Sequence, residues 1–441
     1  MAPDVPSTQV APRRSGAPLF VPVLLAALAL AVVVATLVAT LSMSGVRVPG
    51  RRTLQAVLDR VPQPWKPPRP AYVLPPETTG EPAHVPELSA PARSATGGTP
   101  GGDAPSESRP PAAAAAAAAP GPAAPPTSFA PAPPAWRLEG FRHEWQTWNN
   151  CGPATIAMAT SYFGRPESQA QAAPWLKPNP NDKNVGPDEL VAYARSLGLQ
   201  ADWRAGGDLD RLKLLLANSV PVITSIWITP KPNDGLGHYR LLVGYDDAAG
   251  RFTAYDSFVP PGINLTVPYG QLDDEWRVYN RTYVAVYRPE QAGVVAAILG
   301  SDRDDQTMFA RALAAAQAEA AARPTDAFAW FNVGTNLVAL GRTAEAVPAF
   351  DRARALRLPW RMLWYQLGPF EAYLAEGRLG DVLSLTAANL AQTGDLEESH
   401  YYRGRALQAQ GEVAAARAAY QAALRANPRF APASHALSTL G

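Results

Sequence analysis

The pattern of apolar and polar positions divides the chain into a membrane segment, a spacer and two ordered regions. The first feature is an uncharged apolar run from Leu19 to Leu41. At about 1.5 Å per residue, a helix of this length exceeds the roughly 30 Å core of a bilayer. A cleaved signal peptide has a shorter apolar region of about 7 to 15 residues and a small-residue cleavage site. The run therefore predicts a retained transmembrane anchor at 19–43, after a short tail at 1–18.

The next segment, 44–134, is rich in proline and alanine and has few large apolar residues to bury, with "PAAAAAAAAPGPAAPP" near its centre. This composition predicts a disordered or semi-rigid linker. Its part from about Val61 to Pro134 spans about 50 Å as a coil and roughly 200 Å as extended polyproline. The following domain can therefore stand well clear of a membrane.

The side of the membrane on which the C-terminal part lies is indicated by two opposing signals. More arginines follow the apolar run than precede it: Arg47, Arg51, Arg52 and Arg60 against Arg13 and Arg14. A positive-inside count would place the C-terminal part in the cytoplasm, but long domains cross largely regardless of such counts. Because the linker suits a protein that reaches out from a surface, we expect a single-pass anchor with the C-terminal part outside the cytoplasm.

The last region, 325–441, repeats a two-helix pattern with a period of about 34 residues. Segments that begin at Ala329 and His400 share small and aromatic residues at matching positions, namely Gly334 and Gly404, Gly341 and Gly411, Ala346 and Ala416, Phe350 and Tyr420, and Ala353 and Ala423. A middle segment fits the same period with a two-residue offset before Gly377 and a weaker second helix. The pattern resembles the tetratricopeptide repeat, in which small residues let paired helices approach each other.

Repeats of this kind predict a concave surface that docks a peptide or a protein partner. The alternative is a solenoid that only covers the neighbouring domain. A helical stretch from about Asp305 to Ala322, within 301–324, connects the repeats to the preceding region. We expect the repeats to recruit a substrate or partner rather than to stabilise that region.

The first ordered region, 135–300, contains the chain's single cysteine, Cys151. One cysteine excludes an intramolecular disulfide and a cysteine-rich zinc site, and the sequence indicates no metal or cofactor. The 39 basic and 38 acidic residues of the chain balance, so no basic field for nucleic acid is expected. Cys151 is therefore either a small buried apolar residue or a reactive thiol.

The neighbours of Cys151 favour a reactive thiol. Pro153 suits the first turn of a helix, and "ATIAMATSYF" followed by Gly164 supplies the helix and its terminal glycine. Cys151 then lies at the helix N-terminus, where unpaired N–H groups and the helix dipole favour a thiolate. A nucleophile of this kind also needs a base and a group that orients the base.

Two of the five histidines, His143 and His238, lie in this region, and His238 has the better context. It opens the alternating strand "HYRLLVGY", which passes through "DDAAG" into a second strand, "RFTAYDSF". With a loop at 246–250, Asp256 is the same-face diagonal neighbour of His238, at roughly 7 Å. An even-length loop would move Asp256 to the other face unless a bulge restored the register. The structural alternative is that Asp256 pairs with Arg240, directly opposite it.

Gln146, five residues before Cys151, is the fourth candidate. Its amide N–H can join the backbone N–H of Cys151 in binding the oxyanion of an acyl-transfer intermediate. The alternative is a surface glutamine between Trp145 and Trp148.

The motifs "Q-x4-C-G-P-A-T-I-A-M", "G-H-Y-R-L-L-V-G-Y-D" and "Y-D-S" together resemble the papain-like double-glycine peptidases, the family that processes bacteriocin leaders, over about residues 138–288. The resemblance implies that Cys151 attacks, His238 is the general base, Asp256 orients it and Gln146 serves the oxyanion hole. The segments "VGPDELVAYARSLGL" and "LKLLLANSVPVITSIW" look like the family's second helix and the helix leading into its core strand. This sequence differs from the bacteriocin exporters because one span forms no transporter and no phosphate-binding glycine loop is present.

We therefore expect an α+β papain-like peptidase domain, with the nucleophile helix packed on an antiparallel sheet, followed by an all-α repeat domain. The expected function is hydrolysis of peptide bonds in a peptide or protein substrate. The alternatives are a catalytically inactive adaptor, or a cell-wall amidase or acyltransferase that uses the same Cys-His-Asp set.

Overall fold

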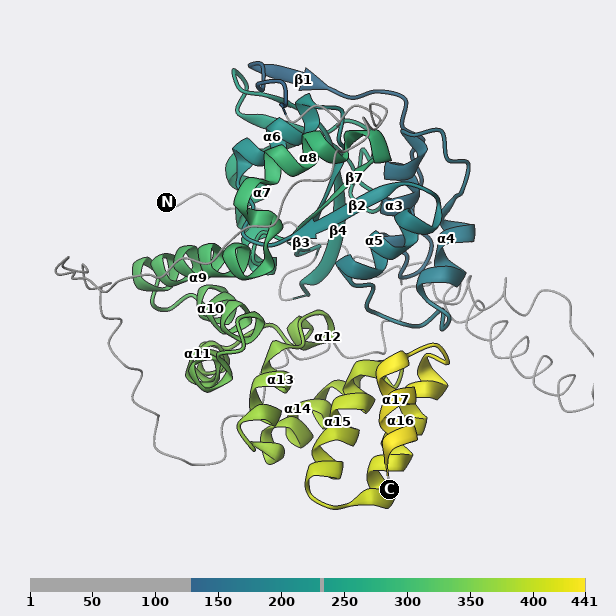
Figure 1. Ribbon diagram of the computed structural model, residues 1–441, viewed down its shortest axis with the longest axis vertical. Helices are drawn as coiled ribbons and strands as arrows, with labels where there is room; N and C mark the ends of the chain where they lie inside the picture. Colours follow the sequence, from purple (N-terminus) through teal and green to yellow (C-terminus); the bar gives the residue numbers. More distant parts are fainter. Residues whose placement is uncertain (1–127, 231–233, 441) are drawn as a thin grey trace, which may run out of the picture. The chain divides into compact units, whose positions relative to one another are not determined.

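The computed structural model describes residues 128–230 and 234–440 (Figure 1). The predicted transmembrane helix at 19–43 and the linker as far as residue 127 lie outside the described residues. Within the described ranges, no helix is both long enough and apolar enough to cross a membrane. The described residues divide into a sheet domain, residues 135–303, and a helical region, residues 305–439.

The sheet domain is built around one antiparallel sheet. Its strands run in the order β2-β7-β3-β4-β5-β6, and β1 pairs with the far end of β4. The strand bounds are β1 Ala135–Arg137, β2 Gln200–Arg204, β3 Val222–Ile228, β4 Leu236–Asp246, β5 Arg251–Tyr255, β6 Leu265–Pro268 and β7 Tyr283–Tyr287. Every strand pair in this sheet is antiparallel, as the sequence predicts.

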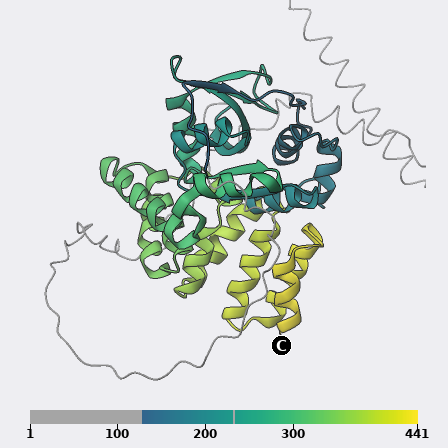
Figure 2. The ribbon, with the colours of Figure 1, turned by 45° about the horizontal axis from the view of Figure 1, so that its top comes forward.

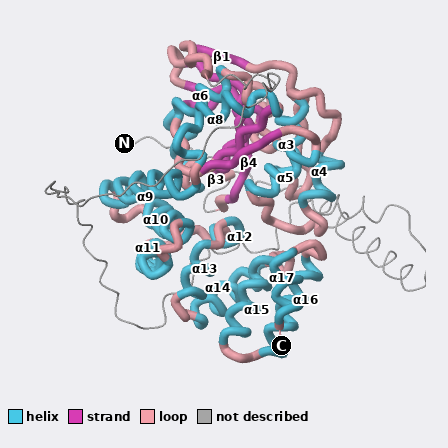
Figure 3. Tube along the Cα trace, in the orientation of Figure 1, coloured by secondary structure: helices cyan, strands magenta, loops and turns pink. Residues whose placement is uncertain are grey.

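Two groups of helices cover the two faces of this sheet (Figure 3). The helices on one face are α3 Cys151–Ser161, α4 Gln169–Leu176 and α5 Pro187–Ser196; those on the other are α6 Leu209–Ala217, α7 Tyr269–Trp276 and α8 Ala292–Leu299. Alternate strand residues supply the two cores: Ile223 packs toward α3, and Val222 packs toward α6. The α+β class expected for this domain is therefore observed.

Helix α4 is an element that the sequence reading missed. Its signal in the sequence is the capping box at Ser168 and Gln171. The side chain of each of these residues accepts a hydrogen bond from the backbone N–H of the other. The Ser168 hydroxyl also accepts a hydrogen bond from the backbone N–H of Ala170. Pro174 inside the short helix weakens the helical pattern, which explains why it is hard to recognise.

The hairpin of β4 and β5 has the expected register near His238, but its loop differs from the prediction and a bulge compensates for the difference. Asp246 pairs with Arg251, so the loop has an even length, which alone would place Asp256 on the wrong face. The register shifts between Leu242 and Gly244, and beyond this bulge Leu241 pairs with Tyr255. The bulge therefore restores the alignment that brings Asp256 to the face of His238.

The helical region consists of successive helices that contact their neighbours in the chain (Figure 2). Its α-helices are α9 Asp305–Ala322, α10 Ala327–Ala339, α11 Thr343–Ala355, α12 Met362–Tyr365, α13 Gly368–Ala375, α14 Leu379–Gln392, α15 Glu397–Ala409, α16 Val413–Ala426 and α17 Ala431–Thr439. The glycines between paired helices have positive φ angles, at Gly341, Gly377 and Gly411.

The small and aromatic residues that define the repeats meet as predicted. A Cβ built on Gly334 would lie 2.6 Å from the ring of Phe350, and one on Gly404 would lie 2.5 Å from the ring of Tyr420. The aromatic ring of the second helix in each pair therefore occupies the space that a larger residue would need on the first helix.

The middle pair differs from the prediction. The sequence predicts a weaker second helix, but α14 has 14 residues and the first helix is the interrupted one. It is split into α12 and α13 at Gln366, whose backbone is extended, just before Gly368 and Pro369. Pro369 has no N–H to bond the carbonyl of Tyr365, as a continuous helix would require, but it suits the first turn of a new helix, so the sequence favours a break between α12 and α13.

The first repeat shares a hydrophobic core with the sheet domain. Trp227 at the end of β3 and Val278 after α7 are buried in one cluster with residues of α10 to α14. Polar contacts support this packing: Arg277 Nη1 lies 2.6 Å from Asp326 Oδ2, and Asn280 Nδ2 donates to Asn336 Oδ1 at 2.7 Å. The repeats therefore stabilise the sheet domain, which differs from the expectation that they only recruit.

Deletion of the chain after Arg323 is expected to destabilise the sheet domain. It would expose Trp227 and Val278 and leave Asn280 and Arg277 without their partners, a loss of about 3 kcal/mol or more. We expect the thermal midpoint of the truncated protein to fall by at least about 10 °C in differential scanning calorimetry. An unchanged midpoint would show that this core contributes nothing to the stability of the sheet domain.

A second contact joins α15 to the loop 177–186 between α4 and α5, and it holds several carboxyl groups. Burial, followed by the charge of Glu397, raises the pKa of Glu398 to about 8. Burial, together with Glu397 and Glu398, raises the pKa of Asp182 as well. One oxygen of Glu397 and one of Glu398 are buried without a hydrogen-bond partner among the described residues, which agrees with neutral carboxyl groups.

These carboxyl groups predict a stability that falls with rising pH. A carboxyl with a raised pKa in the folded state favours folding below its ordinary pKa of about 4.3, and this advantage is lost as pH rises through its folded pKa, about 8 for Glu398. Glu398→Gln should therefore raise the thermal midpoint by a few degrees at pH 8.5 and change it little at pH 5. Equal effects at both pH values would contradict the raised pKa.

Candidate active site

Cys151 is the first residue of α3, and the start of this helix shapes its environment. Pro153 and the rest of the helix are buried against the sheet, while Cys151 itself is partly exposed. The backbone N–H of Gly152 hydrogen-bonds the sulfur and lowers the thiol pKa. The helix is followed by Gly164 with a φ of +77°, as the sequence predicts.

His238 and Asp256 lie together beside this helix. His238 Nε2 donates to Asp256 Oδ1 at 2.9 Å, and both side chains are fully buried. The other ring nitrogen, Nδ1, has no hydrogen-bond partner among the described residues, and the ring is close enough to Cys151 to lower the pKa of its thiol. The structure therefore brings the three residues into the order Cys151, His238, Asp256.

Asp256 is fixed by four hydrogen bonds. Oδ1 also accepts from the backbone N–H groups of Phe258 and Val259, each at 2.8 Å. Oδ2 accepts from Arg240 Nε at 2.9 Å. The pairing of Asp256 with Arg240, considered as an alternative to the pairing with His238, occurs in addition to it. A carboxylate held in this way keeps the imidazole in one orientation and one tautomer.

The charges at this site favour a thiolate and an imidazolium. Burial alone would raise the pKa of Cys151, but the hydrogen bond and charge of His238 outweigh it and lower the pKa below its ordinary value. Burial alone would lower the pKa of His238, but the charge and hydrogen bond of Asp256, assisted by Cys151, raise it to about 9. Both shifts favour a thiolate and an imidazolium over the neutral thiol and imidazole.

His143 lies near the site but contacts the backbone of Asp256 rather than its carboxylate. Its Nε2 is 2.9 Å from the backbone oxygen of Asp256, and its ring packs edge-on against Trp145. A Cβ on Gly262 would lie 2.6 Å from this ring, so the loop of Gly262 packs closely on it. His143 therefore supports the loop that carries Asp256, and of the two histidines only His238 contacts the carboxylate.

Both the backbone and the side chain of Gln146 hydrogen-bond to Ser257. Its backbone N–H donates to the carbonyl oxygen of Ser257 at 2.9 Å, and its side-chain Oε1 accepts from the Ser257 hydroxyl at 2.9 Å. With Oε1 engaged by the Ser257 hydroxyl, Nε2 is the end that can donate to a substrate. Ser257 directly follows Asp256, so the same segment positions both the base and this donor.

Gln146→Ala is expected to lower kcat by about 100-fold, as removal of one oxyanion donor does elsewhere. Because the donor acts on the charge of the transition state, KM should change little. Ser257→Ala should give a smaller loss, since it only frees the amide to rotate. Steady-state kinetics on one peptide substrate checks both variants, and a Gln146→Ala enzyme with wild-type kcat would remove Gln146 from the site.

Sequence reasoning missed Lys177, a lysine that is only 4 % exposed. Its Nζ donates to the backbone oxygen of Asn149 at 2.6 Å, two residues before Cys151. Burial lowers the pKa of Lys177 to about 8, against the opposing charge of Asp182. Its charge also lowers the pKa of Cys151. A lysine in the segment "PWLKPNP" gives no signal of this role, because the contact depends on the fold of the loop.

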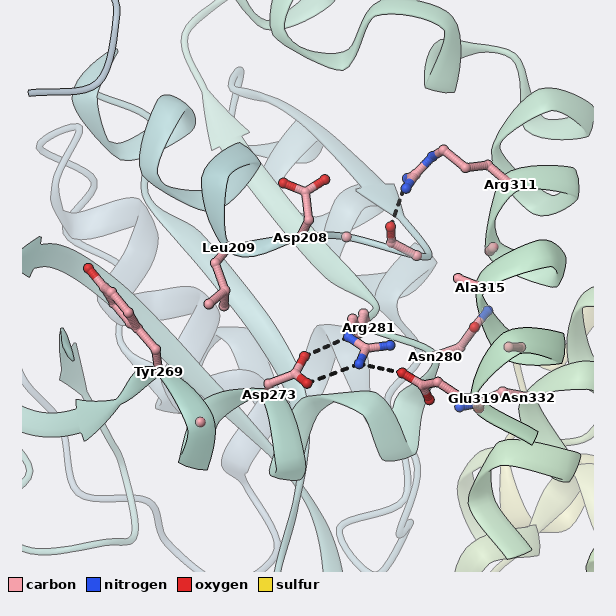
Figure 4. Close-up of a pocket in the computed structure, with 15 residues that line it drawn as sticks. Asp208, Leu209, Tyr269, Asp273, Asn280, Arg281, Arg311, Ala315, Glu319 and Asn332 are labelled. Carbon is pink, nitrogen blue, oxygen red and sulfur yellow. Dashed lines mark hydrogen bonds and ion pairs between the residues drawn. The ribbon is translucent and has the colours of Figure 1, made fainter. Parts of the chain in front are cut away.

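A cavity of about 590 Å³ lies elsewhere in the molecule, between α6, α7 and α9 (Figure 4). Its charged side chains neutralise one another: Arg281 bonds Asp273 and Glu319, each at 2.6 Å. Arg311, at its edge, pairs with Asp302. Among the described residues no group of acidic, histidine and cysteine side chains could hold a metal ion.

Comparison with known families identifies two segments of the chain. Residues 138–284 match the Peptidase_C39 like family, and residues 397–430 match the tetratricopeptide repeat. No curated protein matches the chain. The chain thus contains a C39-like peptidase domain, which bears Cys151, His238 and Asp256, and a tetratricopeptide repeat formed by α15 and α16.

Three solved structures are similar to the peptidase domain. A putative C39-like peptidase from Bacillus anthracis is 16% identical over 35% of this chain and 98% of its own, with a TM-score of 0.29. The peptidase domain of Streptococcus ComA, a bifunctional ABC transporter of a quorum sensing pathway, is 18% identical over 34% of this chain and 99% of its own, with a TM-score of 0.28. A double glycine motif protease of an AMS/PCAT transporter, in complex with a leader peptide, is 16% identical over 35% and 94%, with a TM-score of 0.25.

Proposed function

We propose that this protein is a membrane-anchored cysteine peptidase that hydrolyses peptide bonds through Cys151, His238 and Asp256. The observation that carries the proposal is the buried His238–Asp256 hydrogen bond beside a cysteine at a helix N-terminus. An inert cysteine would need neither a histidine partner nor a carboxylate behind that histidine. The match of residues 138–284 to the C39-like family supports the same interpretation.

The proposed reaction follows from the placement of these groups. The thiolate of Cys151 attacks the carbonyl carbon of the scissile bond, and the negative oxygen accepts hydrogen bonds from Gln146 Nε2 and the backbone N–H of Cys151. The imidazolium of His238 donates its Nδ1 proton to the leaving amine, which departs and leaves a thioester on Cys151. His238 then takes a proton from water, which attacks the thioester, releases the acid product and restores the thiolate.

The anchor and the repeats complete the proposal. The apolar run at 19–43 would hold the protein in a membrane, and the linker would let the catalytic domain act outside the cytoplasm, away from the surface. The repeats would bind the substrate or a partner protein and raise its local concentration to about a millimolar. The match of residues 397–430 to a repeat family of helix pairs supports this role.

The test is digestion of a broad peptide library by the full-length protein, with Cys151→Ala as the matched control and new termini identified by mass spectrometry. We expect cleavages that require Cys151 and a reducing agent. Release of amide-linked cell-wall fragments instead would favour an amidase, and incorporation of a free amine would favour an acyltransferase. No turnover by a wild-type protein that is folded would favour the adaptor.

A further inference from the structure

The segments that carry the nucleophile and the base both contact the helical region. His238 follows Asp234–Gly237, which touches α12. Cys151 lies beside the loop 177–186, which touches the start of α15. The two contacts come from different repeats. The first lies within a few residues of His238 in the chain, and the second is linked to Cys151 through Asn149 and Gly152.

On the histidine side, Arg361 and Tyr365 hold the backbone that precedes His238. Arg361 Nη1 pairs with the Asp234 carboxylate and donates to the backbone oxygen of Gly235 at 3.0 Å. A Cβ on Gly237 would clash with the Tyr279 hydroxyl and lie 3.1 Å from the Tyr365 ring. A larger residue at this position would not fit, so Gly237 is tightly packed between Tyr279 and α12.

On the cysteine side, α15 and its preceding turn hold the loop 177–186 by side-chain amides. Asn179 Nδ2 donates to Asp395 Oδ1 at 3.1 Å, and Asn184 Nδ2 donates to Glu398 Oε1 at 2.8 Å. Further along, Arg429 donates to the backbone oxygen of Pro174 at 3.0 Å, at the end of α4. These contacts join the last repeat to the elements that flank the nucleophile helix.

The loop 177–186 in turn contacts the residues on either side of Cys151, namely Asn149 and Gly152. Lys177 Nζ donates to the backbone oxygen of Asn149, and the Asn149 side chain donates to the backbone oxygen of Asp182. Val185 packs against Gly152, where a Cβ would lie 3.2 Å from the valine side chain. The same valine's backbone oxygen accepts from the hydroxyl of Tyr239, next to His238, at 2.7 Å.

We propose that the helical region is a clamp that fixes the distance between Cys151 and His238, with Arg361 and Tyr365 as positioning residues on the histidine side and Asp395 and Glu398 on the cysteine side. This inference rests on the proposed function, since it assigns the clamp to the same site. It makes the repeats part of the catalytic scaffold as well as a docking surface. A loss of either contact frees one of the two segments, and small displacements between reacting groups cost about 100-fold in rate.

The test uses the full-length protein with Arg361→Gln, Arg361→Lys and Asn184→Ala. We expect Arg361→Gln and Asn184→Ala to lower kcat on a short peptide by about 10-fold with KM within twofold of wild type. The alkylation of Cys151 should require a higher pH in both variants, because the imidazolium no longer stabilises the thiolate. Arg361→Lys keeps the charge and the donor, so it should retain most of the wild-type rate.

The matched control is Arg342→Gln, which removes an exposed ion pair with Glu345 inside α11 and touches nothing in the sheet domain. It should leave both readouts unchanged. Assays are run well below the thermal midpoint of each variant, so that a loss of folded protein does not appear as a loss of rate. If the wild-type thiol is reactive at neutral pH and both anchor variants keep its alkylation profile, the clamp is wrong. If the wild-type thiol itself is unreactive, the proposed peptidase function fails instead.

Discussion

Cys151→Ala is expected to abolish peptide hydrolysis, with a loss of at least about 10⁴-fold in kcat. The variant removes the only nucleophile of the proposed mechanism, and binding and oxyanion stabilisation alone leave a small residual rate. Since the thiol is the chain's single cysteine, labelling by an electrophilic probe should disappear in the same variant. Turnover and mass spectrometry of the labelled protein measure the two effects.

The fold should survive this substitution, because Cys151 is partly exposed at the end of α3. A thermal midpoint within a few degrees of wild type would show this. Residual hydrolysis above about 1% of the wild-type rate would mean that another group performs the chemistry. Cys151→Ser serves as a conservative second variant, and it should also be inactive, since a serine hydroxyl does not ionise at neutral pH.

His238→Ala is the second substitution for which a large effect is expected, about 10³-fold in kcat. His238 stabilises the thiolate and supplies the proton to the leaving amine, so both steps fail without it. For the wild type, activity should decline as pH rises above about 9, where His238 loses its proton. The pH dependence of kcat/KM on one peptide substrate measures this decline in activity.

His143→Ala is the matched control for His238. It removes a hydrogen bond to the backbone of Asp256 but no contact with its carboxylate, so we expect a loss of less than about 10-fold. Asp256→Asn should fall between the two, because an amide can still accept from His238 but does not stabilise the imidazolium. A greater loss in His143→Ala than in His238→Ala would overturn the assignment of the base.

Local chemistry made the helix of Cys151 and the strand of His238 predictable. The proline in the first turn, the glycine after Ser161 and the alternation of β4 depend on neighbouring residues alone. The alignment of His238 with Asp256 was harder, since it depends on a bulge next to Gly244. A Cβ there would lie 2.7 Å from the backbone oxygen of Trp136 in β1. That strand is distant in sequence, so the loop length alone cannot indicate the register.

The contacts between the repeats and the sheet domain could not be predicted in the same way. Arg361 and Asp234 are 127 positions apart, and nothing in either local sequence marks them as partners. Lys177 is similar, because its role near Cys151 exists only after the loop has folded over Asn149. The periodicity of the repeats indicates how their helices pair with one another, whereas the surface on which they pack depends on the shape of another domain.

The most direct measurement of the central claim is the rate of alkylation of Cys151 by iodoacetamide as a function of pH. An ordinary cysteine reacts as its thiol ionises, with a single step near pH 8.5. The structure predicts a thiolate that forms below the ordinary thiol range, held by His238, and a second step near pH 9 as His238 loses its proton. In His238→Ala the low-pH reactivity should vanish. A wild-type profile with one step near pH 8.5, unchanged in His238→Ala, would contradict the account.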